Sequence, residues 1–141
     1  MTQLMRSLTV FITSCALLIT IDFVWLSFVM KDFYTTHLHA VNKLAESTQI
    51  VFNIPAAVAT WALITLGIML FVLPQVQGTS YSNTFLWGAC FGFIVYGVYD
   101  LTNMATIKEW APALAFYDVL WGTFLNGMLA CIVQWINGKL L

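Results

Sequence analysis

The dominant pattern along the chain is four long apolar runs separated by short polar segments. The runs cover residues 8–30, 50–73, 84–103 and 113–136. Each is long enough to cross the hydrocarbon core of a bilayer as a helix, which takes about 20 residues. The pattern predicts an all-α, integral membrane four-helix bundle that forms a single transmembrane domain over residues 1–141. Because the number of spans is even, we expect both termini on one side of the membrane.

Composition supports this class. The chain has 141 residues, of which 61% are hydrophobic and 8% are charged, whereas a soluble domain carries roughly 25% charged residues. No basic run indicates a nucleic-acid partner. Cys15, Cys90 and Cys131 lie far apart within apolar runs, without the C-x-x-C spacing of a redox or zinc site. We interpret them as small buried hydrophobic residues.

The longest polar segment, residues 31–49, is interpreted as a solvated connecting loop with an aromatic entry. Its His37-x-His39 spacing raises the question of a metal site. Two residues apart on a helix, these rings point in different directions, so a metal would need ligands from elsewhere. The sequence leaves the metal open and names no cofactor.

The third run contains Gly88-Ala-Cys-Phe-Gly92. A G-x-x-x-G spacing lets two helix backbones approach closely. Packing inside the bundle is the favoured interpretation of this face. An oligomer formed through the Gly88/Gly92 face is the alternative.

Three carboxylates, Asp22, Asp100 and Asp118, lie within the apolar runs, where a charge is costly and usually functional. The first and third runs cross in one direction and the fourth returns, so all three fall in the same half of the membrane. Asn103 follows Asp100 on roughly the same helix face, and Tyr99 precedes it. We expect a one-sided acidic pocket with the carboxylates within about 10 Å of one another.

Like charges crowded into a medium that cannot solvate them repel one another, so this pocket should hold a proton or a cation near neutral pH. The opposing interpretation is that each aspartate only caps or cross-links helices through neighbouring amide or hydroxyl groups. If the three act as one site, their asparagine variants should have the same phenotype.

A second regularity is the spacing D-x-x-W, which occurs as Asp22/Trp25 and as Asp118/Trp121. At this spacing the indole lies beside the carboxylate of its own helix, and its N–H can donate a hydrogen bond. Coincidence or ordinary anchoring of tryptophan at the membrane interface is the alternative explanation.

The stretches Tyr99-Asp-Leu-Thr-Asn103, Asp118-x-x-Trp-Gly-Thr123 and Asp22-x-x-Trp25-Leu26 resemble the small bacterial four-span membrane proteins grouped as domain-of-unknown-function family 2177. The similarity covers nearly the whole chain. It implies a multi-pass protein of the bacterial inner (cytoplasmic) membrane with a shared polar site. It implies no activity and no substrate.

Three functions fit these observations. The first is a site that binds or modifies a lipid or small amphiphile, with the aspartates as ligands or as general acid and base. The second is a proton- or cation-coupled transport component, and the third is a non-catalytic accessory subunit of a membrane complex. Ser-His pairs, H-E-x-x-H and phosphate-binding glycine loops are absent from the sequence, so enzyme status stays open.

Overall fold

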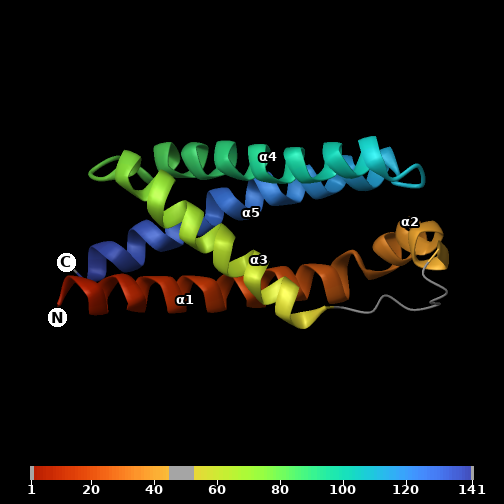
Figure 1. Ribbon diagram of the computed structural model, residues 1–141. Helices are drawn as coiled ribbons and strands as arrows, with labels where there is room; N and C mark the ends of the chain where they lie inside the picture. The colour runs from red at the N-terminus through yellow and green to blue at the C-terminus, as the bar shows by residue number, and fades with distance from the viewer. Residues whose placement is uncertain (1, 45–52, 141) are drawn as a thin grey trace.

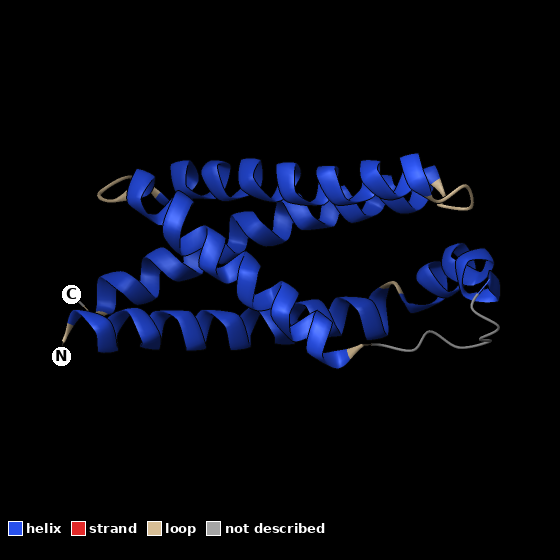
Figure 2. Cartoon of the chain, viewed as in Figure 1, coloured by secondary structure: helices blue, strands red, loops and turns tan. Residues whose placement is uncertain are grey.

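The computed structural model describes residues 2–44 and 53–140, and all regular structure within those ranges is helical (Figures 1 and 2). The elements in order are α1 (Gln3–Val24), the π-helical turn η1 (Trp25–Val29), α2 (Lys31–Leu44), α3 (Ile54–Gly67), the π-helical turn η2 (Ile68–Val72), the 3₁₀ turn η3 (Leu73–Val76), α4 (Tyr81–Thr106) and α5 (Pro112–Lys139). The predicted all-α class is confirmed.

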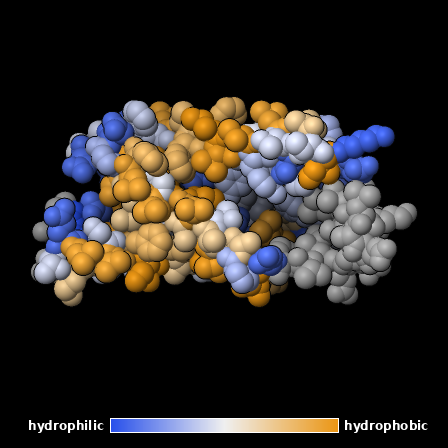
Figure 3. Space-filling view, in the orientation of Figure 1, coloured by the Kyte–Doolittle hydropathy of each residue, from blue (hydrophilic) through white to orange (hydrophobic). Residues whose placement is uncertain are grey.

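Four helical segments are long and apolar enough to cross a membrane, with lengths of 27, 23, 26 and 28 residues. Each exceeds the roughly 20 residues that a bilayer core requires. A broad hydrophobic band surrounds the middle of the visible face, and hydrophilic residues gather toward the ends (Figure 3). Helix α1 begins and helix α5 ends at the same end of the molecule (Figure 1). We call this the terminal end, and the other the distal end.

Local capping chemistry sets where the helices begin. The side chain of Asn53 accepts from the backbone N–H of Ala56 at the start of α3, and Ser80 caps α4 in the same way. Such side chains satisfy backbone donors that the first helical turn leaves free. Pro112 opens α5, where its missing N–H has no consequence. The helices therefore extend a few residues beyond several of the predicted apolar runs.

The interpretation of residues 31–49 as a connecting loop is wrong for residues 31–44, which form helix α2. This segment contains neither glycine nor proline, and its apolar positions recur every three or four residues, as in an amphipathic helix. The ring of Phe33 packs edge-on against Tyr117 of α5 at a centroid distance of 5.1 Å. Aromatic packing against the bundle thus accompanies helix formation here.

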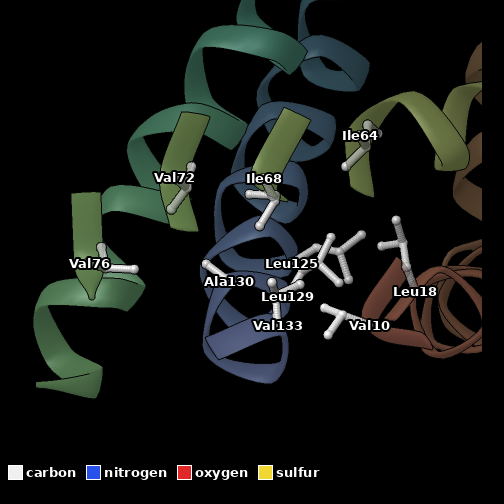
Figure 4. Packing of buried hydrophobic residues seen from close by; sticks show 10 residues of the cluster. All are labelled: Val10, Leu18, Ile64, Ile68, Val72, Val76, Leu125, Leu129, Ala130 and Val133. Carbon is white, nitrogen blue, oxygen red and sulfur yellow. The ribbon is translucent and has the colours of Figure 1, made fainter. Parts of the chain in front are cut away.

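The apolar core lies between α1, α5 and the α3–η2–η3 segment (Figure 4). It comprises Val10, Leu18, Ile64, Ile68, Val72, Val76, Leu125, Leu129, Ala130 and Val133. The core residues on α5 are Leu125, Leu129, Ala130 and Val133. All four follow Asp118 along the helix, toward the terminal end. The core therefore separates the terminal end from the half of the bundle that holds the aspartates.

Gly88 and Gly92 are both buried where α4 packs on α5. A Cβ atom at Gly88 would lie 2.4 Å from the carbonyl oxygen of Asn126, and one at Gly92 would lie 2.4 Å from that of Gly122. The G-x-x-x-G face therefore serves packing within the chain. An oligomer through the Gly88/Gly92 face would have to displace α5, so that alternative does not fit this structure.

Replacing Gly88 with alanine should lower the stability of the bundle by about 1–3 kcal/mol, because the added methyl group meets backbone that cannot move aside easily. Gly97→Ala is the matched control, since a Cβ at Gly97 has nothing within 4 Å and alanine is the better helix former. Thermal unfolding in detergent should rank Gly97→Ala at or above the native chain. Equal melting of the two variants would contradict this account of the α4–α5 contact.

Candidate functional site

Asp22 lies near the end of α1 and connects three helices. Its Oδ2 accepts a hydrogen bond from Trp61 Nε1 of α3 at 2.8 Å, and its Oδ1 accepts one from Trp121 Nε1 of α5 at 2.9 Å. The side chain is 7% exposed. Both carboxylate oxygens are therefore paired with indole donors, which is the arrangement that makes a buried carboxylate tolerable.

The two D-x-x-W pairs interlock across the α1–α5 contact. The rings of Trp25 and Trp121 stack at a centroid distance of 3.9 Å with planes 4° apart, and Trp121 donates to Asp22 of the other pair. The expectation that each indole donates to the aspartate of its own helix is wrong for these contacts. Trp25 opens the π-helical turn η1, and such turns are frequent at functional sites.

Asp118 lies in the second turn of α5 and accepts a hydrogen bond from the Tyr34 hydroxyl at Oδ1. This contact holds α2 against the distal half of the bundle. Burial, and after it the negative charge of Asp118, raises the pKa of Tyr34 above its usual value. The phenol therefore stays protonated, and remains a donor, at every pH at which the protein would be handled.

Asp100 is fully buried in α4. Its Oδ1 accepts from Trp110 Nε1 at 3.1 Å, so the short connection between α4 and α5 folds back over the carboxyl group. The Trp110 ring also packs edge-on against Tyr99 at 5.9 Å. Asp100 Oδ2 is buried without a donor anywhere in the described parts of the chain. A buried acceptor left unpaired costs free energy.

The Asp100 and Asp118 carboxyl groups face each other across the α4–α5 contact closely enough for their charges to interact. Two ionised carboxylates cannot hydrogen-bond, because both are acceptors only. A single proton shared by the two groups would allow one hydrogen bond between them.

Tyr96 of α4 packs against α5 in the same half of the bundle as the aspartates. Gly122 makes room for this ring, because a Cβ atom there would lie 2.2 Å from Tyr96 Cγ. The glycine of D-x-x-W-G-T thus has a steric explanation. It allows an aromatic ring to occupy the contact surface between α4 and α5.

The structure brings Asp22, Trp25, Asp118 and Trp121 into one connected group, with the charges of Asp22 and Asp118 close enough to interact. Asp100 joins this group through Asp118. Tyr99 and Asn103, the remaining sequence candidates, lie at its edge. Tyr99 is 54% exposed, and the Asn103 amide nitrogen is buried without a well-aligned acceptor among the described residues.

Four residues of the site were not predicted from the sequence: Tyr34, Trp61, Tyr96 and Trp110. They lie on three different helices and one connecting segment. A donor that reaches across from another helix has no fixed spacing from its acceptor in the sequence, so pattern analysis cannot locate it.

A groove of about 500 Å³ runs between α4 and α5 on the outer surface, and Asp100 belongs to its lining. The other lining residues include Phe93, Leu101, Phe116 and Leu120, whose side chains are largely exposed. The groove thus faces the region that lipid would occupy and has one carboxyl group at its base.

The described residues hold no cluster of three or more histidine, cysteine or acidic side chains that could bind a metal ion. His37 Nδ1 donates to the backbone oxygen of Phe33 at 2.8 Å, so one of its ring nitrogens is already in use. The side chain of His39 lies outside the described residues.

Replacing Tyr34 with phenylalanine should cost about 1–2 kcal/mol of stability, because Asp118 loses a donor while remaining buried. Hydrogen exchange should accelerate in α2 first. Tyr117→Phe is the matched control, since Tyr117 is 46% exposed and its hydroxyl bonds to no other described residue. Equal exchange rates in the two variants would show that the hydroxyl does not hold α2.

The same contact predicts a pH dependence. An unfolded tyrosine ionises from about pH 10 upward, whereas the raised pKa keeps folded Tyr34 protonated. Above pH 10 the folded state therefore binds more protons than the unfolded state, so stability should fall as the pH rises. Denaturation followed from about pH 9 to about pH 11 should show a steeper loss for the native chain than for Tyr34→Phe. Parallel curves would exclude this linkage.

Comparison with known proteins assigns the chain to a family. No functionally curated protein matches it, and no solved structure matches it. A family model described as "Predicted membrane protein (DUF2177)" matches residues 7–135, a range that includes every aspartate and tryptophan of the site. The chain therefore belongs to the DUF2177 family of predicted membrane proteins.

Proposed function

We propose that the Asp100–Asp118 pair binds the polar end of a lipid or small amphiphile that enters from the bilayer through the α4–α5 groove. One observation carries this proposal: Asp100 Oδ2 is buried, lacks a donor, and belongs to a residue that lines an apolar groove. An unpaired buried acceptor beside such a groove calls for a ligand that brings its own donor.

Charge narrows the class of ligand. The described lining of the groove contains no basic side chain, so nothing there would attract a phosphate or a carboxylate. An acid pair that shares one proton carries a net charge of −1, which favours a cationic donor. A primary ammonium group satisfies both requirements, because it is positively charged and has three N–H donors.

The other two hypotheses fit less well. A transport component needs a polar path from the aspartates to the terminal end. The apolar core lies between the aspartates and that end. An accessory subunit whose aspartates pair with a partner's basic residue needs those carboxylates on an outer face. Asp22 and Asp100 are instead buried and bonded to indoles of the same chain.

Binding of three amphiphiles with the same chain length tests the proposal on protein in lipid nanodiscs. Dodecylamine has N–H donors and a charge, dodecanol has one neutral donor, and dodecyltrimethylammonium has a charge but no donor. We expect dodecylamine to bind at least ten-fold more tightly than either of the others, as a charge-assisted hydrogen bond in a buried site implies. Equal affinities would show that the groove binds any apolar chain without specificity, which would refute the proposal.

A further inference from the structure

A second and larger groove lies at the terminal end, on the far side of the core from the aspartates. Its volume is about 1090 Å³, and it is bounded by the start of α1, the η2–η3 segment, the beginning of α4 and the end of α5. Arg6 and Asn137 line one side of the groove, and Gln77 and Tyr81 line the other side. Hydrophilic residues flank a hollow at this end of the molecule in Figure 3.

The cation in this groove is held by a neutral partner. Arg6 donates to Asn137 Oδ1 from Nε at 3.1 Å and from Nη2 at 2.7 Å. These bonds fix the plane of a half-buried guanidinium group and use two of its five N–H donors. No carboxylate side chain belongs to the described lining of the groove, so three donors and a full positive charge are oriented without an anion from that lining.

Side-chain hydrogen bonds join the wall opposite Arg6 to α5. Gln134 Nε2 donates to the backbone oxygens of Val76 and Thr79, each at 3.1 Å, and Gln134 Oε1 accepts from the Thr84 hydroxyl at 2.8 Å. The turn between η3 and α4 is thereby fixed to α5. One wall of the groove is thus held in place by side-chain hydrogen bonds.

Leucine side chains of α1, α3 and η2 form an apolar wall of the groove that faces outward. Its lining includes Leu4, Leu8, Leu66 and Leu70, which are 69%, 50%, 42% and 57% exposed. The cation lies near the start of α1, where a membrane-spanning helix emerges at the headgroup level. A cationic end joined to an apolar trough has the polarity of a phospholipid, with an anionic headgroup above two acyl chains.

We infer that this groove binds one anionic phospholipid, with its phosphate on the Arg6 guanidinium and its acyl chains along the leucine-lined wall. Arginine suits this role because its planar fork matches the geometry of phosphate oxygens. Asn137 is a positioning residue that presents the fork. The site is independent of the aspartates, since the apolar core lies between the two grooves.

Native mass spectrometry of the full chain, released from nanodiscs of defined composition, tests this inference. Phosphatidylglycerol should remain bound at a stoichiometry of one. Diacylglycerol with the same acyl chains, which lacks the phosphate, should be lost, and inorganic phosphate should not compete at millimolar concentration. Retention of diacylglycerol to the same extent, or displacement by free phosphate, would overturn the assignment to a phospholipid.

Variants separate a specific site from general attraction at the membrane surface. Arg6→Gln should reduce phosphatidylglycerol retention at least ten-fold, and Arg6→Lys should reduce it less. Lys139→Gln is the matched control, because Lys139 is exposed at the same end and outside the groove. If Lys139→Gln loses the lipid as completely as Arg6→Gln, the binding is non-specific and the inference fails.

A second variant guards against misfolding as the cause of lipid loss. Asn137→Asp keeps the Arg6 contact and gives the guanidinium group an anionic partner within the chain. The melting temperature should hold or rise while phosphatidylglycerol retention falls. Full retention in this variant would mean that Arg6 does not contact the phosphate, which would also overturn the inference.

Discussion

Asp22→Leu is expected to destabilise the bundle more than any other substitution of a single aspartate. The variant leaves the indole N–H groups of Trp61 and Trp121 buried without an acceptor. Losing one partner of a buried charged hydrogen bond costs more than the bond itself contributes, because the remaining group stays desolvated. Interhelical hydrogen bonds in membranes are individually modest, so we expect a combined loss of about 3 kcal/mol. Reversible unfolding in mixed micelles measures it.

Two further variants define the cause of that loss. Asp22→Asn keeps one side-chain oxygen as an acceptor, so its stability should lie between those of the native chain and Asp22→Leu. Combining Asp22→Leu with Trp61→Phe and Trp121→Phe removes the unpaired donors, and this triple variant should recover part of the lost stability. A triple variant that is less stable by the sum of the three single losses would show that the indoles contribute through packing alone.

The second large effect concerns ligand binding. Asp100→Asn and Asp118→Asn should each weaken dodecylamine binding at least ten-fold, because the amide N–H₂ group takes up the neighbouring carboxylate and replaces an oxygen that could accept from the ammonium group. Stability should hold or rise. An amide at either position can donate a hydrogen bond to the neighbouring carboxylate, which satisfies the group that is now orphaned.

Asp32→Asn is the matched control for these two variants, since Asp32 is an exposed carboxylate on α2. It should bind dodecylamine as the native chain does and unfold at the same temperature. Unchanged binding in Asp100→Asn or in Asp118→Asn would remove the acid pair from the site. Loss of folded protein in both would assign the pair a structural role instead.

These expectations depart from the interpretation of the three aspartates as one functional unit. Sequence position alone gives Asp22, Asp100 and Asp118 the same description, a carboxylate in an apolar run. Their surroundings differ. Asp22 has a donor on each oxygen, whereas Asp100 has one on a single oxygen. We therefore expect Asp22 to act mainly in stability, and Asp100 with Asp118 in binding.

The membrane fold follows directly from sequence, because the length of an apolar run and the thickness of a bilayer are one-dimensional quantities that can be compared. The placement of all three aspartates on one side of the apolar core follows from the alternating direction of the spans. Helix α2 was missed because its polar composition suits both a solvated loop and an amphipathic helix. The aromatic contact between Phe33 and Tyr117 depends on packing that the sequence does not display.

The partners of the carboxyl groups could not be predicted for a different reason. Which indole reaches which carboxylate depends on the rotation of each helix about its axis and on how the helices cross. The π-helical turn at Trp25 also changes the direction of the side chains that follow it, and a regular 3.6-residue period does not anticipate it. The D-x-x-W spacing predicted hydrogen bonds within one helix, whereas the bond in the structure runs from Trp121 of α5 to Asp22 of α1.

The most direct test of the central claim is infrared spectroscopy of the protein in nanodiscs at about pH 7. A protonated carboxylic acid has a C=O stretching band that an ionised carboxylate lacks, and exchange into D₂O shifts it. If Asp100 and Asp118 share one proton, the native chain has such a band, Asp22→Asn keeps it, and Asp100→Asn and Asp118→Asn each lose it. A native chain without the band, or a band that survives in both of the last two variants, would contradict the acid pair.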